Sequence, residues 1–231
     1  NINGEWRYYY ENEGTIWKVG NYSNGIKQGD WNRYYEDGPK YSEGAFDNNH
    51  ETGQWTSYHH NGQIMEQGTF QEGKMHGEWK GFYEDGKQKF VSVCSNGVRN
   101  GRYSLWFENG QQQFEKSFKD GREDGQNQEW HKNGKLKEKG SYTAGAKNGE
   151  WEYFYATGKP FQTIGYKNGK QHGTYQGWYE TGVKWYYSNY MDGKLNGVST
   201  NFSESGEIEF KAKYKNGKLV KVLFRGDGVG K

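Results

Sequence analysis

Acidic side chains recur in this sequence at a spacing that could support acid–base chemistry. Two carboxylates roughly 5–9 Å apart can hydrolyse a glycosidic bond. Here, however, the carboxylates occupy two fixed places of a repeated motif: Glu5, Asp30, Glu78 and Glu150 at its second position, and Glu36, Glu84, Glu108, Glu180 and Glu204 at its eighth. An active site is a single constellation, whereas these residues form stripes. We therefore expect a solvated face, no catalytic residues and no enzyme.

The histidines and the cysteine are the residues that could bind a metal ion or act as nucleophiles. His76 and His172 each precede a glycine in a turn, while His59 and His131 lie three repeats, or about 30 Å, apart. None has the spacing of zinc ligands. Cys94 is the only cysteine, and no phosphate-binding loop, serine-nucleophile motif or zinc-protease motif is present. We expect no metal site and no cofactor.

A repeated motif positions these side chains. Each repeat opens with a glycine, and the openings stand at residues 4, 29, 53, 77, 101, 125, 149, 173 and 197, which are 24 residues apart after the first. A fixed period of 20–50 residues indicates a repeat array. We expect one repeat domain over residues 1–231, with about nine repeats. An aliphatic stretch at 219–225 breaks the motif and predicts a C-terminal capping strand.

Each repeat predicts one β-hairpin. In residues 149–172, two runs of about six β-type residues are bounded by glycine turns. Asn-Gly and Asp-Gly pairs, such as Asp37-Gly38 in the first turn and Asn168-Gly169 in the second, supply the positive φ angles of tight turns. The fold class is therefore all-β, an elongated single array of stacked antiparallel hairpins without helices.

Aromatic residues form three columns along the repeats and predict the core. The chain holds 10 Trp, 20 Tyr and 12 Phe residues, and its mean hydropathy is −1.29, so burial must come from rings. The third position is aromatic except at Asn127 and Ser199, the sixth is aromatic throughout, and the eighteenth is aromatic except at Cys94. We assign the core to the sixth and eighteenth positions, and Cys94 to a small buried thiol.

Two local features concern how the strands are built. The third and sixth positions face opposite sides of a regular strand, so either both faces have aromatics or a bulge turns one of them. The residues leave both alternatives open. Glycines at the fifth position, Gly81 and Gly177, favour a bulge over the close approach of another group.

A seventh-position ladder of rings is the candidate partner-binding surface. Most of these rings have a polar group, as half-buried or surface rings do, and aromatic residues concentrate at binding hot spots. The alternative is that the rings only pack against neighbouring repeats. The candidate residues are Tyr35, His59, Tyr83, Phe107, His131, Tyr155 and Tyr179, and Tyr10 begins the same column.

Charge and hydropathy limit the classes of partner. The net charge is +2, with both signs scattered along the chain, so we expect no nucleic-acid partner. No apolar run reaches the roughly 18 residues of a transmembrane segment. The sequence begins with Asn1, which a cleaved secretion signal or a trimmed boundary would explain, and a secreted or cell-envelope location is favoured over a cytoplasmic one. Exposed edge strands or ends could mediate self-association.

The motif G-x-W-x-x-Y-Y-x-x-G, followed by an aromatic residue and N-G-K-x-x-G, resembles the MORN repeat. It is most similar to the variant common in bacterial proteins, some described as antitoxins of the YwqK type. The matching residues include Gly4-Glu5-Trp6-Arg7-Tyr8-Tyr9-Tyr10, Gly29-Asp30-Trp31 and Gly149-Glu150-Trp151. The resemblance implies ribbons of stacked hairpins that act as scaffolds, protein-binding platforms or spacers, with no catalytic residues.

We therefore expect a non-enzymatic protein-binding or scaffolding protein that uses an extended aromatic-rich β surface. Two alternatives stay open. One is a carbohydrate-binding surface of a secreted or cell-envelope protein, in which the rings would stack on sugars. The other is an antitoxin-like protein that neutralises a toxin partner. A protein partner is favoured over a carbohydrate, because a repeat array is an extended surface more than a pocket.

Overall fold

The computed structural model describes residues 2–11 and 14–226. The regular secondary structure of these residues consists of β-strands. These residues form two compact units, one of residues 2–11, 14–111 and 118–121, the other of residues 112–117 and 122–226. The predicted all-β class of antiparallel hairpins is confirmed, and the described residues contain no helix that could span a membrane. The single repeat domain stays a prediction.

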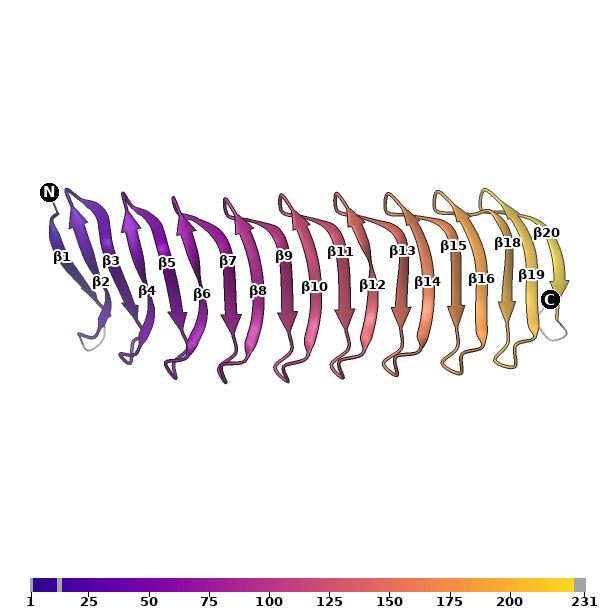
Figure 1. The fold of residues 1–231 in the computed structure, drawn as a ribbon, viewed down its shortest axis with the longest axis horizontal. Helices are drawn as coiled ribbons and strands as arrows, with labels where there is room; N and C mark the ends of the chain where they lie inside the picture. The colour runs from indigo at the N-terminus through magenta and orange to yellow at the C-terminus, as the bar shows by residue number, and fades with distance from the viewer. Residues whose placement is uncertain (1, 12–13, 227–231) are drawn as a thin grey trace. The chain divides into compact units, whose positions relative to one another are not determined.

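The first unit consists of consecutive antiparallel strands, each paired with the next in the chain (Figure 1). The strands are β1 (Gly4–Tyr9), β2 (Ile16–Ser23), β3 (Ile26–Tyr34), β4 (Lys40–Asp47), β5 (His50–Tyr58), β6 (Ile64–Gln71), β7 (Lys74–Phe82), β8 (Gln88–Ser95) and β9 (Val98–Trp106). The next strand, β10 (Gln112–Lys119), contributes residues to both units.

The second unit repeats this arrangement. Its strands are β11 (Arg122–Trp130), β12 (Leu136–Thr143), β13 (Ala146–Phe154), β14 (Pro160–Lys167), β15 (Lys170–Trp178), β16 (Lys184–Met191), β17 (Lys194–Leu195), β18 (Gly197–Phe202), β19 (Ile208–Lys215) and β20 (Lys218–Arg225). Both β17 and β18 pair with β16, so together they take the place of one long strand. The predicted capping strand at 219–225 lies within β20.

Two kinds of turn join the strands. In the two-residue turns, both residues have positive φ, as at Asn168 (50°) and Gly169 (78°), which is the prediction for Asn-Gly and Asp-Gly pairs. The turns that follow the seventh position are longer, and there only the glycine has positive φ. Gly38, for example, has a φ of 104° and donates its N–H to the carbonyl of Tyr35. The seventh residue therefore starts each of these turns.

A bulge on the second strand of each hairpin settles the two alternatives left open for the third and sixth positions. In the β3–β4 hairpin, Arg33 pairs with Ser42 and Tyr34 with Lys40, so Tyr41 is the extra residue. The first strand keeps its alternation, and its aromatics consequently lie on both faces of the sheet. What the bulge redirects is the thirteenth residue of the repeat, which then lies beside the long turn.

The core differs from the prediction at the sixth position. The buried aromatic residues are at the third and eighteenth positions, and in the first unit Trp31, Phe46, Trp55 and Trp79 form one cluster with Cys94. The rings alternate edge to face, with centroids 5.3 Å apart for Phe46–Trp55. The sixth column was assigned to the core wrongly, because its alternation places it on the opposite, polar face, where its rings are half-buried or exposed. The prediction of a buried thiol at Cys94 is confirmed, at 6% exposure.

The glycines at the fifth position also have a reason other than the predicted bulge. The register shift after this position occurs in other hairpins too, including those without a glycine there. A Cβ at Gly81 would overlap the ring of Phe90, and one at Gly177 would overlap the indole of Trp185. The predicted irregularity is present, since a register shift follows each of these glycines, and the close approach of a ring is the reason that glycine is needed at both positions.

Candidate functional site

The structure places the seventh-position ladder at the start of the long turns, which lie along the lower side of each unit in Figure 1. All seven candidate side chains are half-buried. The first unit contains Tyr35, His59, Tyr83 and Phe107, and the second contains His131, Tyr155 and Tyr179. Each ring thus lies where the first strand of its hairpin ends and the long turn begins.

Hydrogen bonds from these rings join successive repeats. The hydroxyl of Tyr35 donates to the carbonyl of Tyr58 (2.8 Å), and that of Tyr155 donates to the carbonyl of Trp178 (2.8 Å). The same bond joins Tyr10 to Tyr34, Tyr83 to Trp106 and Tyr179 to Phe202. The imidazole Nε2 atoms of His59 and His131 lie 3.0 and 3.1 Å from the carbonyls of Phe82 and Phe154. In each case the acceptor is the sixth residue of the next repeat.

These contacts orient the rings and engage the donor proton of each tyrosine hydroxyl. Burial raises the pKa of Tyr35, Tyr83 and Tyr155 above the ordinary tyrosine value. A hydroxyl that is bonded within the array is not free to contact a ligand in the same direction. The imidazole of His60 stacks on the ring of Tyr35, with centroids 3.8 Å apart, and Lys89 Nζ lies over the ring of Tyr83 at 5.6 Å from its centroid. The role of the ladder as a partner surface stays a prediction.

Bulged side chains extend the ladder sideways, a feature that the sequence interpretation missed. Tyr41 packs against Tyr35 with ring centroids 5.1 Å apart, and Phe161 packs against Tyr155 at 4.9 Å. Trp17 packs against Tyr10 at 6.4 Å. Trp17 and Tyr41 are 43% and 36% exposed. An aromatic residue six or seven places after the ladder ring was the sequence signal for this pairing.

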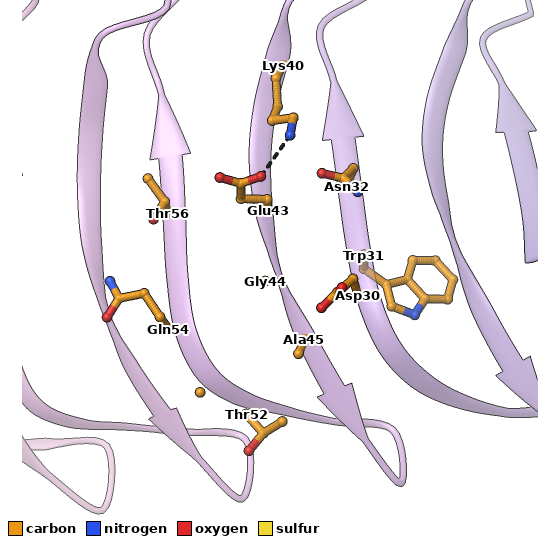
Figure 2. A pocket seen from close by; sticks show the side chains of 11 residues that line it. Asp30, Trp31, Asn32, Lys40, Glu43, Gly44, Ala45, Thr52, Gln54 and Thr56 are labelled. Atoms are coloured by element: carbon orange, nitrogen blue, oxygen red, sulfur yellow. Dashed lines mark hydrogen bonds and ion pairs between the residues drawn. The ribbon is translucent and has the colours of Figure 1, made fainter.

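The opposite, polar face of the first unit has an open hollow of about 690 Å³. In Figure 2, Lys40 and Glu43 lie between Asn32 on one neighbouring strand and Thr56 on the other, and the indole of Trp31 points away from this ion pair. The lining offers hydrogen-bond donors and acceptors but no aromatic platform. It is therefore a polar surface, and its chemistry depends on Glu43.

Both carboxylate oxygens of Glu43 accept hydrogen bonds from neighbouring side chains. One carboxylate oxygen accepts from Lys40 Nζ at 2.7 Å and the other from the hydroxyl of Tyr58 at 2.5 Å. These bonds, with that from Lys40 the larger, hold the pKa of Glu43 below its usual value. The bond to Glu43 raises the pKa of Tyr58 to about 12. Lys40 and Tyr58 thus stabilise Glu43 as an ionised carboxylate.

In the second unit, the Asn127 cluster (Lys116, Glu123, Asn127, Glu129 and Glu138) replaces aromatic packing with charge. Asn127 is 1% exposed, and its Nδ2 donates to Glu138 at 3.3 Å. Lys116 Nζ lies 3.2 Å from both Glu123 and Glu129. Burial lowers the pKa of Lys116, but the two carboxylates raise it by more, and the net shift is upward. Lys116 is therefore a charged ammonium group and not a nucleophilic amine.

Lys147 is a second half-buried lysine of this unit. Its Nζ lies 3.7 Å from the ring centroid of Trp151 and donates to the hydroxyl of Tyr153 at 2.8 Å. Burial lowers the pKa of Lys147. Among residues 2–11 and 14–226, no three His, Cys, Asp or Glu side chains come together in a way that could hold a metal ion. Lys116 is thus held by two carboxylates, whereas Lys147 is held by a ring and a hydroxyl.

Comparison with known families agrees with the hairpin repeats. Five segments match the family described as MORN repeat variant: residues 51–72, 75–89, 123–144, 147–168 and 195–221. The first, third and fourth of these contain most of the β5–β6, β11–β12 and β13–β14 hairpins. These matches support the MORN repeat family for this chain. No curated protein matches the sequence.

Proposed function

We propose that this chain is a non-enzymatic protein-binding or scaffolding repeat protein of the bacterial-type MORN variant. Its partner contacts the seventh-position ladder and the bulged rings beside it. One observation supports the proposal most. The rings of the ladder are anchored by hydrogen bonds to the next repeat, while the neighbouring Trp17 and Tyr41 stay 43% and 36% exposed.

Fixed rings favour binding because little freedom is lost when a partner docks. Ordering a mobile side chain at an interface costs about 0.5–1.5 kcal/mol, and the rings of the ladder are already ordered by the fold. Tyrosine and tryptophan also combine a large apolar area with few rotatable bonds, which makes them frequent hot spots. A row of anchored rings is a suitable platform for an extended segment of a partner protein.

The repeat spacing suggests the form of that segment. Two strands of a sheet span roughly 10 Å, so within one unit successive rings of the ladder recur at about that interval. A polyproline II helix rises about 3.1 Å per residue and completes a turn every three residues, or about 9.3 Å. Such a segment would place one side chain on each ring, and we expect partner contacts at every third residue.

The test is a binding measurement with the partner that co-purifies with the native protein. After the partner is purified, its affinity is measured by isothermal titration for the wild type and for Tyr41→Ala/Phe161→Ala. Both changes remove rings beside the ladder and keep the hydrogen bonds between repeats. We expect a loss of at least tenfold, as at other aromatic hot spots.

Matched variants separate binding from folding. Tyr35→Phe and Tyr155→Phe keep the ladder rings and remove only the hydroxyls that anchor them within the array, so we expect a smaller loss of affinity than for Tyr41→Ala/Phe161→Ala. Unchanged affinity of Tyr41→Ala/Phe161→Ala would contradict the proposal. A response of tryptophan fluorescence to polysaccharides, without a protein partner, would favour the carbohydrate alternative, and rescue of growth beside a toxin would favour the antitoxin alternative.

A further inference from the structure

The strand β20 stands out because all eight of its residues are exposed. Its apolar side chains are accessible on both faces: Leu219 is 54% exposed, Val220 57%, Val222 37%, Leu223 45% and Phe224 46%. Its valine, leucine and phenylalanine residues have high β-propensity, while its three cations disfavour pairing with a positively charged strand. Among the residues that the structure describes, this surface contacts neither a second layer nor a further hairpin.

One backbone edge of β20 is open in the described part of the chain. β20 pairs with β19 from Lys215↔Lys218 to Phe210↔Arg225, and among residues 2–11 and 14–226 no other strand pairs with it. An unpaired edge presents a row of N–H and C=O groups that can accept an additional strand. The strand thus offers backbone hydrogen bonds and apolar side chains at the same place.

Positive charge is concentrated around this edge. Residues 208–225 contain the acidic Glu209 and six basic residues, Lys211, Lys213, Lys215, Lys218, Lys221 and Arg225, which gives a net charge of +5. The whole chain has a net charge of only +2. An occupant of this edge therefore gains from negative charge, which also speeds its approach.

We propose that the open edge of β20 binds an extended protein segment in which apolar and acidic residues alternate, and that this segment adds as a further strand. Its backbone pairs with β20, and its apolar side chains lie beside Leu219 and Val222, on the face that these residues share with Tyr214 and Ala212. Its carboxylates lie beside Lys218 and Lys221 on the other face. This interaction is independent of the seventh-position ladder and goes beyond the function proposed above.

A second copy of the same strand fits this edge less well. Antiparallel pairing of β20 with its own copy places three positive charges of one strand against three of the other. In the register that pairs Lys221 with Val222, Lys218 lies opposite Arg225. Like charges directly opposite each other destabilise a pair of strands, so the charge pattern favours an acidic partner.

The experiment uses the full chain and a fluorescent peptide of four Glu-Val pairs, with binding followed by anisotropy. We expect saturable binding that weakens with added salt, and no binding of the matching Lys-Val peptide. Methylation of alternate backbone nitrogens in the Glu-Val peptide should abolish binding, because it removes the hydrogen bonds of an added strand. Charge reversal in Lys218→Glu/Lys221→Glu should reduce the affinity at least tenfold.

The control variant is Lys167→Glu/Lys170→Glu, which has the same charge change around an equivalent Asn-Gly turn. It should bind the Glu-Val peptide as the wild type does, and so should Tyr41→Ala/Phe161→Ala, which separates this test from that of the ladder. Equal binding of the N-methylated peptide would overturn the proposal. So would a dimer that blocks the peptide, or binding of phosphatidylserine vesicles but not of the peptide.

Discussion

The indole of Trp151 lies against the backbone of Gly140 so closely that a Cβ on Gly140 would overlap the indole ring. Gly140 is at the sixteenth position of one repeat, and Trp151 is at the third position of the next. Trp151 is fully buried, and its indole N–H donates to the carbonyl of Ser141 at 3.2 Å. The missing side chain of Gly140 therefore creates the space that the core tryptophan fills.

The same pairing explains where the core column is interrupted. Gly20, Gly44 and Gly68 make the same contact with Trp31, Trp55 and Trp79. Where the sixteenth position is not glycine, the next repeat has no tryptophan at its third position. The pairs are Ser92 with Tyr103, Lys116 with Asn127, Ile164 with Tyr175 and Ser188 with Ser199. Glycine at the sixteenth position of one repeat and tryptophan at the third position of the next are thus either both present or both replaced.

Gly140→Ala should destabilise the protein by about 1–3 kcal/mol, as overpacking of a core usually does. The added methyl group can be accommodated only if the buried indole of Trp151 moves. The measurement is urea unfolding followed by tryptophan fluorescence. Ser188→Ala is the matched control, because Ser188 has the equivalent position, is fully buried and its hydroxyl has no hydrogen-bond partner among the described residues. A wild-type midpoint for Gly140→Ala would contradict this packing.

A double-mutant cycle at Lys116 and Asn127 should show whether the glycine–tryptophan pair of the other repeats can be restored here. Asn127→Trp alone introduces an indole where the sixteenth position still has a lysine side chain. Lys116→Gly alone removes the cation that lies 3.2 Å from Glu123 and Glu129. We expect each single variant to be destabilised and the double variant to be more stable than the sum predicts, with a coupling of about 1–3 kcal/mol. Additive effects would show that the two positions do not share one packing site.

Removing one hydrogen bond between repeats should lower the stability of the fold modestly and have a local effect. Tyr155→Phe removes the donor to the carbonyl of Trp178 (2.8 Å) and should cost about 0.5–1.5 kcal/mol. Hydrogen exchange should quicken around the turn of residues 155–159 and the end of β15. Tyr41→Phe is the control, since its ring is 36% exposed, and it should unfold as the wild type does. Uniform exchange in both variants would argue against a tether at Tyr155.

The hydrogen bond between Tyr58 and Glu43 predicts that the stability of the fold depends on pH in the alkaline range. The pKa of Tyr58 is raised to about 12 by its bond to Glu43, whereas that of an unfolded tyrosine is about 10. The unfolded chain loses its proton first, so this contribution to stability is fully present below about pH 10 and declines as the pH rises through about 12. Absorbance at 295 nm, taken as wild type minus Tyr58→Phe, should titrate near 12.

Glu43→Gln provides the check on the cause of this shift. With the carboxylate replaced, the pKa of Tyr58 should move back toward about 10, the ordinary tyrosine value. The same difference titration reads this directly. A value near 10 in the wild type would mean that the short bond between the Tyr58 hydroxyl and Glu43 is absent in solution.

Much of the hairpin architecture could be predicted from the sequence because glycine and asparagine report backbone conformation directly. Asn168 and Gly169 have the predicted positive φ angles, and Cys94 has the predicted burial. The sixth column misled the prediction of the core because a constant aromatic residue was taken as a buried one. When a strand has rings on both faces, the recurrence of an aromatic residue in every repeat does not show which face is covered. The alternation of side chains along the strand does show which rings share a face.

The candidate site was harder to predict, for two physical reasons. The acceptors of the ladder bonds, such as the carbonyl of Tyr58, are backbone atoms, which leave no trace in the residue types. The bulge that places Tyr41 beside Tyr35 depends on the register of two strands, and the sequence does not fix that register by itself. The exchange of Gly140 and Trp151 for Lys116 and Asn127 was visible only by comparing one repeat with the next.

Hydroxyl-radical footprinting of the purified complex tests the central claim, that a protein partner lies on the seventh-position ladder, most directly. Side-chain oxidation is measured by mass spectrometry with and without the partner, at Tyr35, Tyr41, Tyr155 and Phe161. The proposal predicts that these rings are protected in the complex, while the exposed Leu223 and Phe224 of β20 are oxidised as in the free protein. Unchanged oxidation of the four rings, with protection elsewhere on the molecule, would contradict it.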